Sequence, residues 1–162
     1  EQLRNLSFWT LGSLSGANWT ISAIIFVVLI GVCLKVKQLM SAMNALALGK
    51  AAATHVGIDI QKIRTQVVIM VAVLSGLAVA WCGMIGFISL IAPHIVRHIS
   101  GSDHRRVIPF SMLIGAILLL CADTVARTIA IPAEVPVGIF TSILGAPFFM
   151  MLLAKFRQSN GA

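Results

Sequence analysis

Five apolar stretches, separated by polar and basic segments, dominate the pattern along the chain. They are Ile21–Leu34, Val67–Cys82, Met84–Val96, Val107–Ala122 and Pro136–Ala154. A helix that crosses about 30 Å of hydrocarbon needs roughly 20 residues, and flanking Thr, Ser and Gly residues bring the first, second and fourth stretches to that length. Met84–Val96 stays short and carries a proline near its end, so it is either a short crossing helix or a re-entrant segment packed inside a bundle.

The basic residues alternate with these stretches in a way that sets an orientation. If the five segments cross in turn, only Arg4 and Arg127 fall on one side of the membrane. The other ten of the twelve basic residues fall on the opposite side, namely Lys35, Lys37, Lys50, Lys62, Arg64, Arg97, Arg105, Arg106, Lys155 and Arg157. Basic loops stay in the cytoplasm, which predicts a cytoplasmic carboxy terminus, extracytoplasmic residues 1–20 and a true crossing by Met84–Val96.

The composition agrees with a membrane protein and excludes several other classes. Hydrophobic residues make up 59% of the 162 positions and charged residues 10%, with a mean hydropathy of +1.00. A soluble domain carries about a quarter charged residues, so this chain has too little polar surface for a soluble globule, and disorder, collagen and coiled coil are excluded as well. The net charge of +7 reflects membrane topology and not nucleic-acid binding, because the basic residues lie between apolar stretches.

We therefore expect an all-α, polytopic membrane helical bundle with about five transmembrane segments, forming one domain over residues 1–162. The chain starts at Glu1 without Met and has an odd number of spans, whereas transport folds are usually built from repeated halves. It is expected to be the carboxy-terminal part of a longer transporter. Cys33, Cys82 and Cys121 lie in apolar runs without metal-ligand spacing, so buried free thiols are expected, with no metal and no cofactor.

The loop at residues 41–57 is moderately apolar although it lies on the cytoplasmic side. Its composition favours two short helices that meet at Gly49, the second of them closed by Gly57. An exposed apolar hairpin must rest on something. It is either an amphipathic connector in the headgroup layer or a docking surface for a soluble partner, and composition alone does not decide between them.

Polar side chains also lie near the end of the third stretch and the start of the fourth. His94 and His98 are four residues apart and share a helix face, but no carboxylate or thiolate completes a metal set, so interfacial histidines are favoured over a metal site. Asp103 is of the type that caps a helix amino terminus, here that of the fourth span.

The pair Asp123 and Arg127, spaced i, i+4, is either a plain ion pair or presents an outward cation beside Glu134 to an acidic extracellular partner. Gly145-Ala146-Pro147 interrupts the fifth span, where the proline removes one helix hydrogen bond. Packing is favoured over a hinge at this interruption.

Six motifs occur in a characteristic order. They are Leu46-Ala47-Leu48-Gly49; Gly86-Phe87-Ile88 with Ala92-Pro93-His94-Ile95-Val96-Arg97; Gly101 with Asp103-His104-Arg105; Ala122-Asp123 with Ala126-Arg127; Glu134-Val135-Pro136-Val137-Gly138; and Gly145-Ala146-Pro147-Phe148-Phe149. In this order the chain resembles the carboxy-terminal half of the FecCD-type permeases of bacterial ABC importers for iron chelates, heme and cobalamin.

The resemblance implies a ten-helix permease in the plasma (inner) membrane of bacteria, working as a homodimer or pseudo-dimer. Its partners would be an ABC ATPase subunit, an extracytoplasmic substrate-binding protein, a second permease subunit and membrane lipid. Residues 41–57 would be the coupling helices that dock on the ATPase, through Asn44, Leu46, Leu48, Gly49, Lys50, Ala52 and Gly57. Docking of the binding protein is implied for Arg127 and Glu134. Packing or gating is implied for Gly86, Pro93, His94, Gly145 and Pro147.

Two positions depart from the family pattern. Lys50 stands where the family usually shows Glu, which alters a polar contact with the ATPase, and Ser89 stands where the family favours Gly, which loosens one close helix approach.

The expected function is that of a permease subunit that imports an iron chelate by alternating access, with a ferric siderophore as the expected cargo and heme or cobalamin as alternatives. The chain has no G-x-x-x-x-G-K-[ST] loop, so it is not the ATPase and is not expected to be an enzyme. The competing class is an ion- or proton-coupled carrier, which needs an ionisable group near the bilayer centre. An intramembrane hydrolase is weaker still, because Ser75, Ser89 and Ser111 have no partner placed to activate them.

Overall fold

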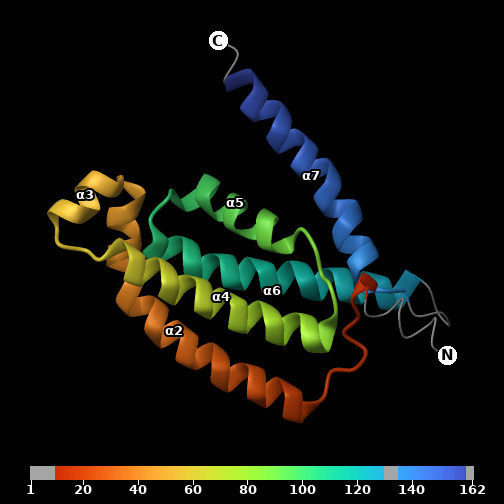
Figure 1. Ribbon diagram of the computed structural model, residues 1–162. Helices are drawn as coiled ribbons and strands as arrows, with labels where there is room; N and C mark the ends of the chain where they lie inside the picture. The colour runs from red at the N-terminus through yellow and green to blue at the C-terminus, as the bar shows by residue number, and fades with distance from the viewer. Residues whose placement is uncertain (1–9, 130–134, 160–162) are drawn as a thin grey trace.

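The computed structural model describes residues 10–129 and 135–159, and this part of the chain is built from helices (Figure 1). The helices are α2 (Trp19–Ala47), α3 (Lys50–His55), α4 (Ile60–Cys82), α5 (Ile88–Ser100), α6 (His104–Ile129) and α7 (Val137–Ser159). Four of them are long and apolar enough to cross a membrane, and these are α2, α4, α6 and α7. The expected all-α membrane bundle is confirmed.

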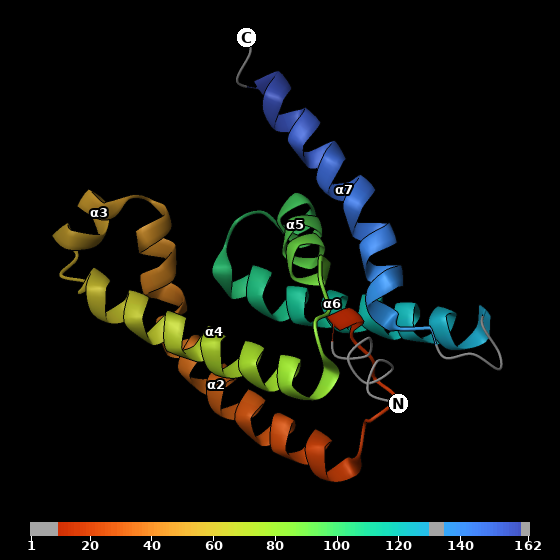
Figure 2. The ribbon, with the colours of Figure 1, turned by 45° about the vertical axis from the view of Figure 1, so that its right-hand side comes forward.

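The helices reverse direction in turn. The chain runs toward α3 in α2, away from it in α4, back in α5 and away again in α6 (Figure 1). We call the place where α2 ends and α6 begins the α3 end of the bundle. α7 starts beside the far end of α6 and then diverges from the other helices (Figure 2). Its main helix contacts are with α5 and α6.

The third predicted span differs from the expectation. Helix α5 begins at Ile88 and not at Met84, and its 13 residues make a helix only about 20 Å long, so it does not span by itself. The preceding residues 83–87 are not helical, and Gly83 ends α4 with a positive φ of 69°. The return toward the α3 end is thus made by a non-helical stretch followed by a short helix, which corrects the prediction of a crossing helix over Met84–Val96.

The first predicted span is also longer than its apolar core. Helix α2 continues unbroken through Ser41 to Ala47, so the first of the two short helices expected in the 41–57 loop is the end of α2. Its 29 residues span about 43 Å, well beyond the hydrocarbon thickness. The break expected at Gly49 is present, since this glycine has a φ of 117°.

The most extensive helix contact lies between α5 and α6. Ala92 and Val96 of α5 and Val107 of α6 are buried, and a Cβ added at Gly115 would lie 3.6 Å from Cβ of Ala92. Small residues let helix backbones approach closely, which is how membrane helices gain packing energy. By contrast α4 has no buried residue, and Cys121 is exposed while Cys33 and Cys82 are half-buried, so the expectation of buried thiols is wrong within this chain.

A tight junction joins the amino-terminal segment to the ends of α4 and α7. The Ser13 amide donates a hydrogen bond to the Cys82 carbonyl at 2.8 Å. Gly138, at the start of α7, sits against the Leu11 carbonyl so closely that an added Cβ would overlap it. We call this contact region, formed by residues 11–13, 82–85 and 137–138, the outer junction.

The outer junction predicts a strong position effect for alanine. Gly138→Ala should lower the stability of the full-length protein by about 1–3 kcal/mol, because the new methyl group meets backbone that cannot move aside. Gly115→Ala is the matched control, since its methyl would make an ordinary 3.6 Å contact. Thermal unfolding in detergent measures both variants, and equal midpoints for the two would contradict the close approach at Leu11.

Candidate functional site

The α3 end presents a short helical hairpin to its surroundings. Leu48 is 82% exposed and Val56 is 73% exposed, so the two ends of α3 carry bare apolar side chains. Gly49 and Gly57 flank the helix with positive φ angles of 117° and 76°, a conformation that glycine adopts without strain. Ala53 is fully buried, and α3 contacts both α2 and α4, so the hairpin is packed against its neighbouring helices.

Gly57 closes the carboxy-terminal end of α3, as predicted. The Gly57 amide donates to the Thr54 carbonyl at 3.0 Å and the Ile58 amide to the Ala53 carbonyl at 3.1 Å. These bonds satisfy carbonyls at the end of a helix and require the left-handed residue that Gly57 supplies. The glycine therefore turns the chain from α3 into α4.

A groove of about 550 Å³ lies between the hairpin and α4. Leu46 and Lys50, two of the predicted coupling residues, line it together with Arg64 and His104. Most of its other lining side chains are apolar, and they include Met43, Ile60, Ile63, Val67 and Val68. Ala52 is half-buried within α3. Of the predicted coupling residues, Leu48 is thus strongly exposed, whereas Leu46 and Lys50 line this groove.

Asn44 lies differently from the other predicted coupling residues, because its amide faces the start of α6. Its Oδ1 accepts the His104 backbone N–H at 2.9 Å and lies 2.7 Å from His104 Nδ1. Its Nδ2 donates to Asp103 Oδ1 at 2.6 Å. One turn earlier in α2, Ser41 Oγ accepts from Arg105 Nη2 at 3.0 Å. We call these five residues the α2–α6 node. Sequence reasoning missed it because its partners are about 60 positions apart and no local pattern signals the pairing.

Asp103 caps α6 as predicted and is also held by the node. Its Oδ1 accepts the Arg105 backbone N–H at 2.9 Å, which is the bond expected of a helix-capping side chain. This bond first, and the Asn44 amide second, favour the charged carboxylate and hold the pKa of Asp103 below its ordinary value.

The histidines of α5 serve packing in this structure. The His94 ring stacks on His98 with centroids 6.3 Å apart, and it meets the Phe148 ring of α7 edge-on at 5.5 Å. Pro93 lies within α5, which continues through it. Among the described residues, no group of three or more His, Cys, Asp or Glu side chains is placed to hold a metal ion.

The two predicted packing glycines, Gly86 and Gly145, differ in their surroundings. Phe87 has a φ of 65°, a left-handed conformation that is unusual for a bulky residue. Its ring lies against Gly145 of α7, where an added Cβ would overlap the Phe87 side chain. Gly86, by contrast, has open space around it, and Pro147 lies inside α7 without ending it. Of these residues, Gly145 makes the close approach between α5 and α7.

At the opposite end of α6, Arg127 Nε donates to Asp123 Oδ2 at 2.8 Å. The i, i+4 ion pair read from the sequence is therefore confirmed. The Arg127 side chain is 58% exposed and that of Asp123 is 18% exposed, so the carboxylate holds one edge of a guanidinium that faces outward. Glu134, predicted to act with Arg127, lies outside the described residues.

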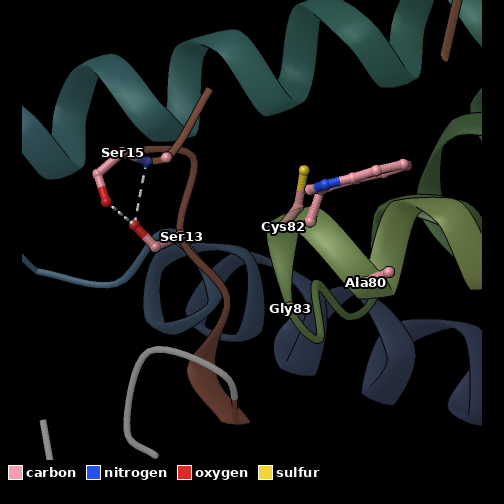
Figure 3. A pocket seen from close by; sticks show the side chains of 7 residues that line it. Ser13, Ser15, Ala80, Cys82 and Gly83 are labelled. Carbon is pink, nitrogen blue, oxygen red and sulfur yellow. Dashed lines mark hydrogen bonds between the residues drawn. The ribbon is translucent and has the colours of Figure 1, made fainter. Parts of the chain in front are cut away.

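A small pocket of about 140 Å³ lies beside the outer junction (Figure 3). Ser13 and Ser15 stand on one side of it and Cys82 on the other, with the two serine hydroxyls 2.8 Å apart. The space suits a few water molecules and is too small for a large chelate. No local sequence pattern marks this pocket, because residues 13–16 and 80–83 are brought together only by the fold.

These features define a multi-pass helical membrane protein with a projecting hairpin at one end and an outward arginine at the other. The family model described as the FecCD transport family matches residues 1–155. The chain belongs to this family, and the resemblance carried by its motifs is confirmed.

Curated relatives and a solved structure agree with this assignment. The chain is 40% identical over 160 residues to the hemin transport system permease protein HmuU of Yersinia pestis, covering 99% of this chain and 48% of the relative. It is 38% identical over 157 residues to the Fe(3+) dicitrate transport system permease protein FecD of Escherichia coli, covering 97% and 49%. It is 36% identical over 161 residues to the vitamin B12 import system permease protein BtuC of Vibrio vulnificus, covering 98% and 47%.

The structural match has a TM-score of 0.87 at 34% identity, covers 96% of this chain and 50% of the other, and is described as an inward-facing metal-chelate type ABC transporter. The chain therefore spans about half the length of the relatives it matches. None of these four is described as an ion- or proton-coupled carrier, so the competing class gains no support. The relatives are permease proteins and not ATPases.

The two hydrogen bonds that Asp103 accepts, from the Arg105 backbone and from Asn44, predict a measurable change in its pKa when one of them is removed. Asn44→Ala should raise the pKa of Asp103 toward the ordinary value of about 3.9, because one hydrogen bond to the carboxylate is lost. The lowered pKa means that this carboxylate stabilises the fold above that ordinary value and ceases to do so as pH falls through the lowered one. Carbon-13 NMR of the labelled carboxyl group measures the shift. Ser41→Ala, which leaves both Asp103 bonds in place, is the control, and an unchanged pKa in Asn44→Ala would contradict the assignment.

Proposed function

We propose that this chain is the carboxy-terminal half of the permease subunit of an ABC importer. The observation that carries the proposal is the family match over residues 1–155 combined with a coverage of about half of relatives that are named permeases. The complete permease would have ten transmembrane helices and would lie in the plasma membrane of a bacterium, with the α3 end and the carboxy terminus in the cytoplasm. The basic residues gathered near the α3 end support that orientation.

The hairpin around α3 is the surface that receives the ATPase. Its apolar tip supports this role, because Leu48 projects from the end of the bundle where a soluble subunit can reach it. The alternative is a connector that rests in the headgroup layer. It accounts less well for the burial of Ala53, because a helix packed against the protein is not free to lie on the lipid surface. Movement of two ATPase subunits would push the hairpins of two permease subunits and open the path between them alternately to each side.

Helix α7 is suited to a subunit interface. It diverges from the remaining helices (Figure 2) and carries exposed apolar residues along its second half, including Phe149, Met150, Met151 and Leu153. The missing half of the permease and a second permease subunit, as a homodimer or pseudo-dimer, would pack around this part of the molecule.

The cargo is a large metal chelate or macrocycle, and a ferric siderophore is the expected substrate. The names of the relatives support this class of cargo, because they specify hemin, vitamin B12 and ferric dicitrate. Extracytoplasmic delivery would use a binding protein that docks at Arg127 and Glu134. The exposed guanidinium that Asp123 holds in place supports this docking role.

Leu48→Asp tests the hairpin. In the full-length permease it should abolish retention of the ATPase subunit during purification in detergent, because a carboxylate at an apolar contact must be desolvated without a partner. Leu48→Met, which keeps an apolar side chain of similar volume, should retain the ATPase. Normal retention by Leu48→Asp would return the hairpin to the role of a membrane-surface connector.

Arg127→Glu tests the outward end. It should weaken association with the cognate binding protein at least about tenfold, in line with the cost of losing a charge pair and introducing repulsion at an interface. Arg127→Lys is the control that keeps the charge. Binding is measured by titration in nanodiscs, and a reversed charge on the binding protein should restore it. If the reversal restores nothing, Arg127 has only its ion pair with Asp123.

A further inference from the structure

The helices divide into two groups that are joined at a few places. Helices α2, α3 and α4 contact one another, and α5, α6 and α7 contact one another, while the extensive contact between the groups runs between α2 and α6. Figures 1 and 2 agree with this division, because α2 runs beside α4 and α5 runs beside α6 in both views. A displacement that begins in α3 therefore reaches the second group by way of α2.

The α2–α6 node lies where that displacement would arrive first. Asn44 is in the same unbroken helix as Ala47, two residues before the chain turns at Gly49 into α3. A continuous helix moves as a rigid element, so Asn44 follows the hairpin. Its hydrogen bonds to Asp103 and His104 place it on the first turn of α6.

An asparagine amide is suited to this contact. Its Oδ1 accepts two N–H groups of His104, and one of them is a backbone N–H at the start of α6, which has no partner inside the helix. Its Nδ2 supplies the donor that the Asp103 carboxylate needs. A single side chain thus holds both the cap residue and the first residue of α6, with both polarities used.

We propose that Asn44 is a positioning residue for energy coupling, which fastens the ATPase-docking hairpin to α6 so that the second helix group moves with it. This inference rests on the proposed function, since it assigns a path for the displacement that the ATPase imposes. The outer junction joins the two groups at the other end, where Gly138 of α7 lies against the Leu11 carbonyl in the segment that precedes α2, so the groups are held together at both ends.

The test compares Asn44→Asp with a charge exchange. Asn44→Asp replaces the Nδ2 donor by a carboxylate oxygen that faces the Asp103 carboxylate, where the hydrogen bond was 2.6 Å long. Adding Asp103→Asn restores one carboxylate and one amide in exchanged positions, so the acceptors for His104 and Arg105 and the donor between the two side chains are all present again. Asn44→Ala removes the amide without adding charge, which keeps the test valid if Asn44→Asp does not fold.

The full-length permease is purified with its ATPase subunit and reconstituted in nanodiscs, after Cys33, Cys82 and Cys121 are replaced by alanine. Spin labels are attached at Val79→Cys of α4 and Ile129→Cys of α6, positions that are 43% and 70% exposed. Distances between the labels are measured before and after addition of ATP with orthovanadate. ATPase retention is measured on the same samples, because the node is not the docking surface.

We expect every variant to retain the ATPase. With the node intact, α4 and α6 should move together, so the label distance should not change with nucleotide in the wild type, in Asp103→Asn or in the exchanged double variant. It should change in Asn44→Asp and Asn44→Ala, because the first helix group then moves without α6. A distance that changes in the wild type, that stays constant in both single Asn44 variants, or that changes in the double variant as much as in Asn44→Asp would overturn the inference while the proposed function stands. A wild-type permease that retains no ATPase overturns both.

Discussion

The structure depends on one demand of the hydrocarbon core, which is that every backbone N–H and C=O must find a partner within the protein. Helices satisfy that demand internally, and this is why α2, α4, α6 and α7 can leave apolar faces exposed along their length. The non-helical residues 83–87 are the exception, and they run beside the outer junction, where glycines admit backbone at very short range. The close approach at Gly138 and the short helix α5 are two consequences of the same constraint.

Much of this arrangement could be predicted from the sequence, because a membrane imposes its pattern residue by residue. The length of the apolar stretches predicted the four long helices. The turns at Gly49 and Gly57 were predicted because glycine readily adopts positive φ angles. The start of α5 could not be found in this way, since the apolar pattern is continuous from Met84 and only the packing of Phe87 on Gly145 decides where the helix begins. Likewise α2 continues to Ala47 because nothing before Gly49 interrupts a helix-forming run.

The candidate sites divide by the same logic. Arg127 and its partner Asp123 share one helix, so their spacing alone revealed the pair. The partners of Asn44 lie on a different helix, and their pairing depends on the register between α2 and α6, which no local pattern encodes. The family resemblance predicted a coupling role for the 41–57 segment, but it did not distinguish the exposed Leu48 from Asn44, which faces α6. In the proposed function, that distinction separates the surface that would meet the ATPase from the contact that would pass its motion to α6.

Photo-crosslinking from the tip of the hairpin tests the central claim most directly, which is that α3 is the face that meets the ATPase. A photoreactive amino acid is placed at Leu48 in the full-length permease. The control position is Ile129, which is also strongly exposed and lies at the opposite end of the bundle. Irradiation of membranes containing the complete importer should give a covalent product with the ATPase subunit from position 48 and none from position 129. The absence of a product from position 48, or the same product from both positions, would contradict the account.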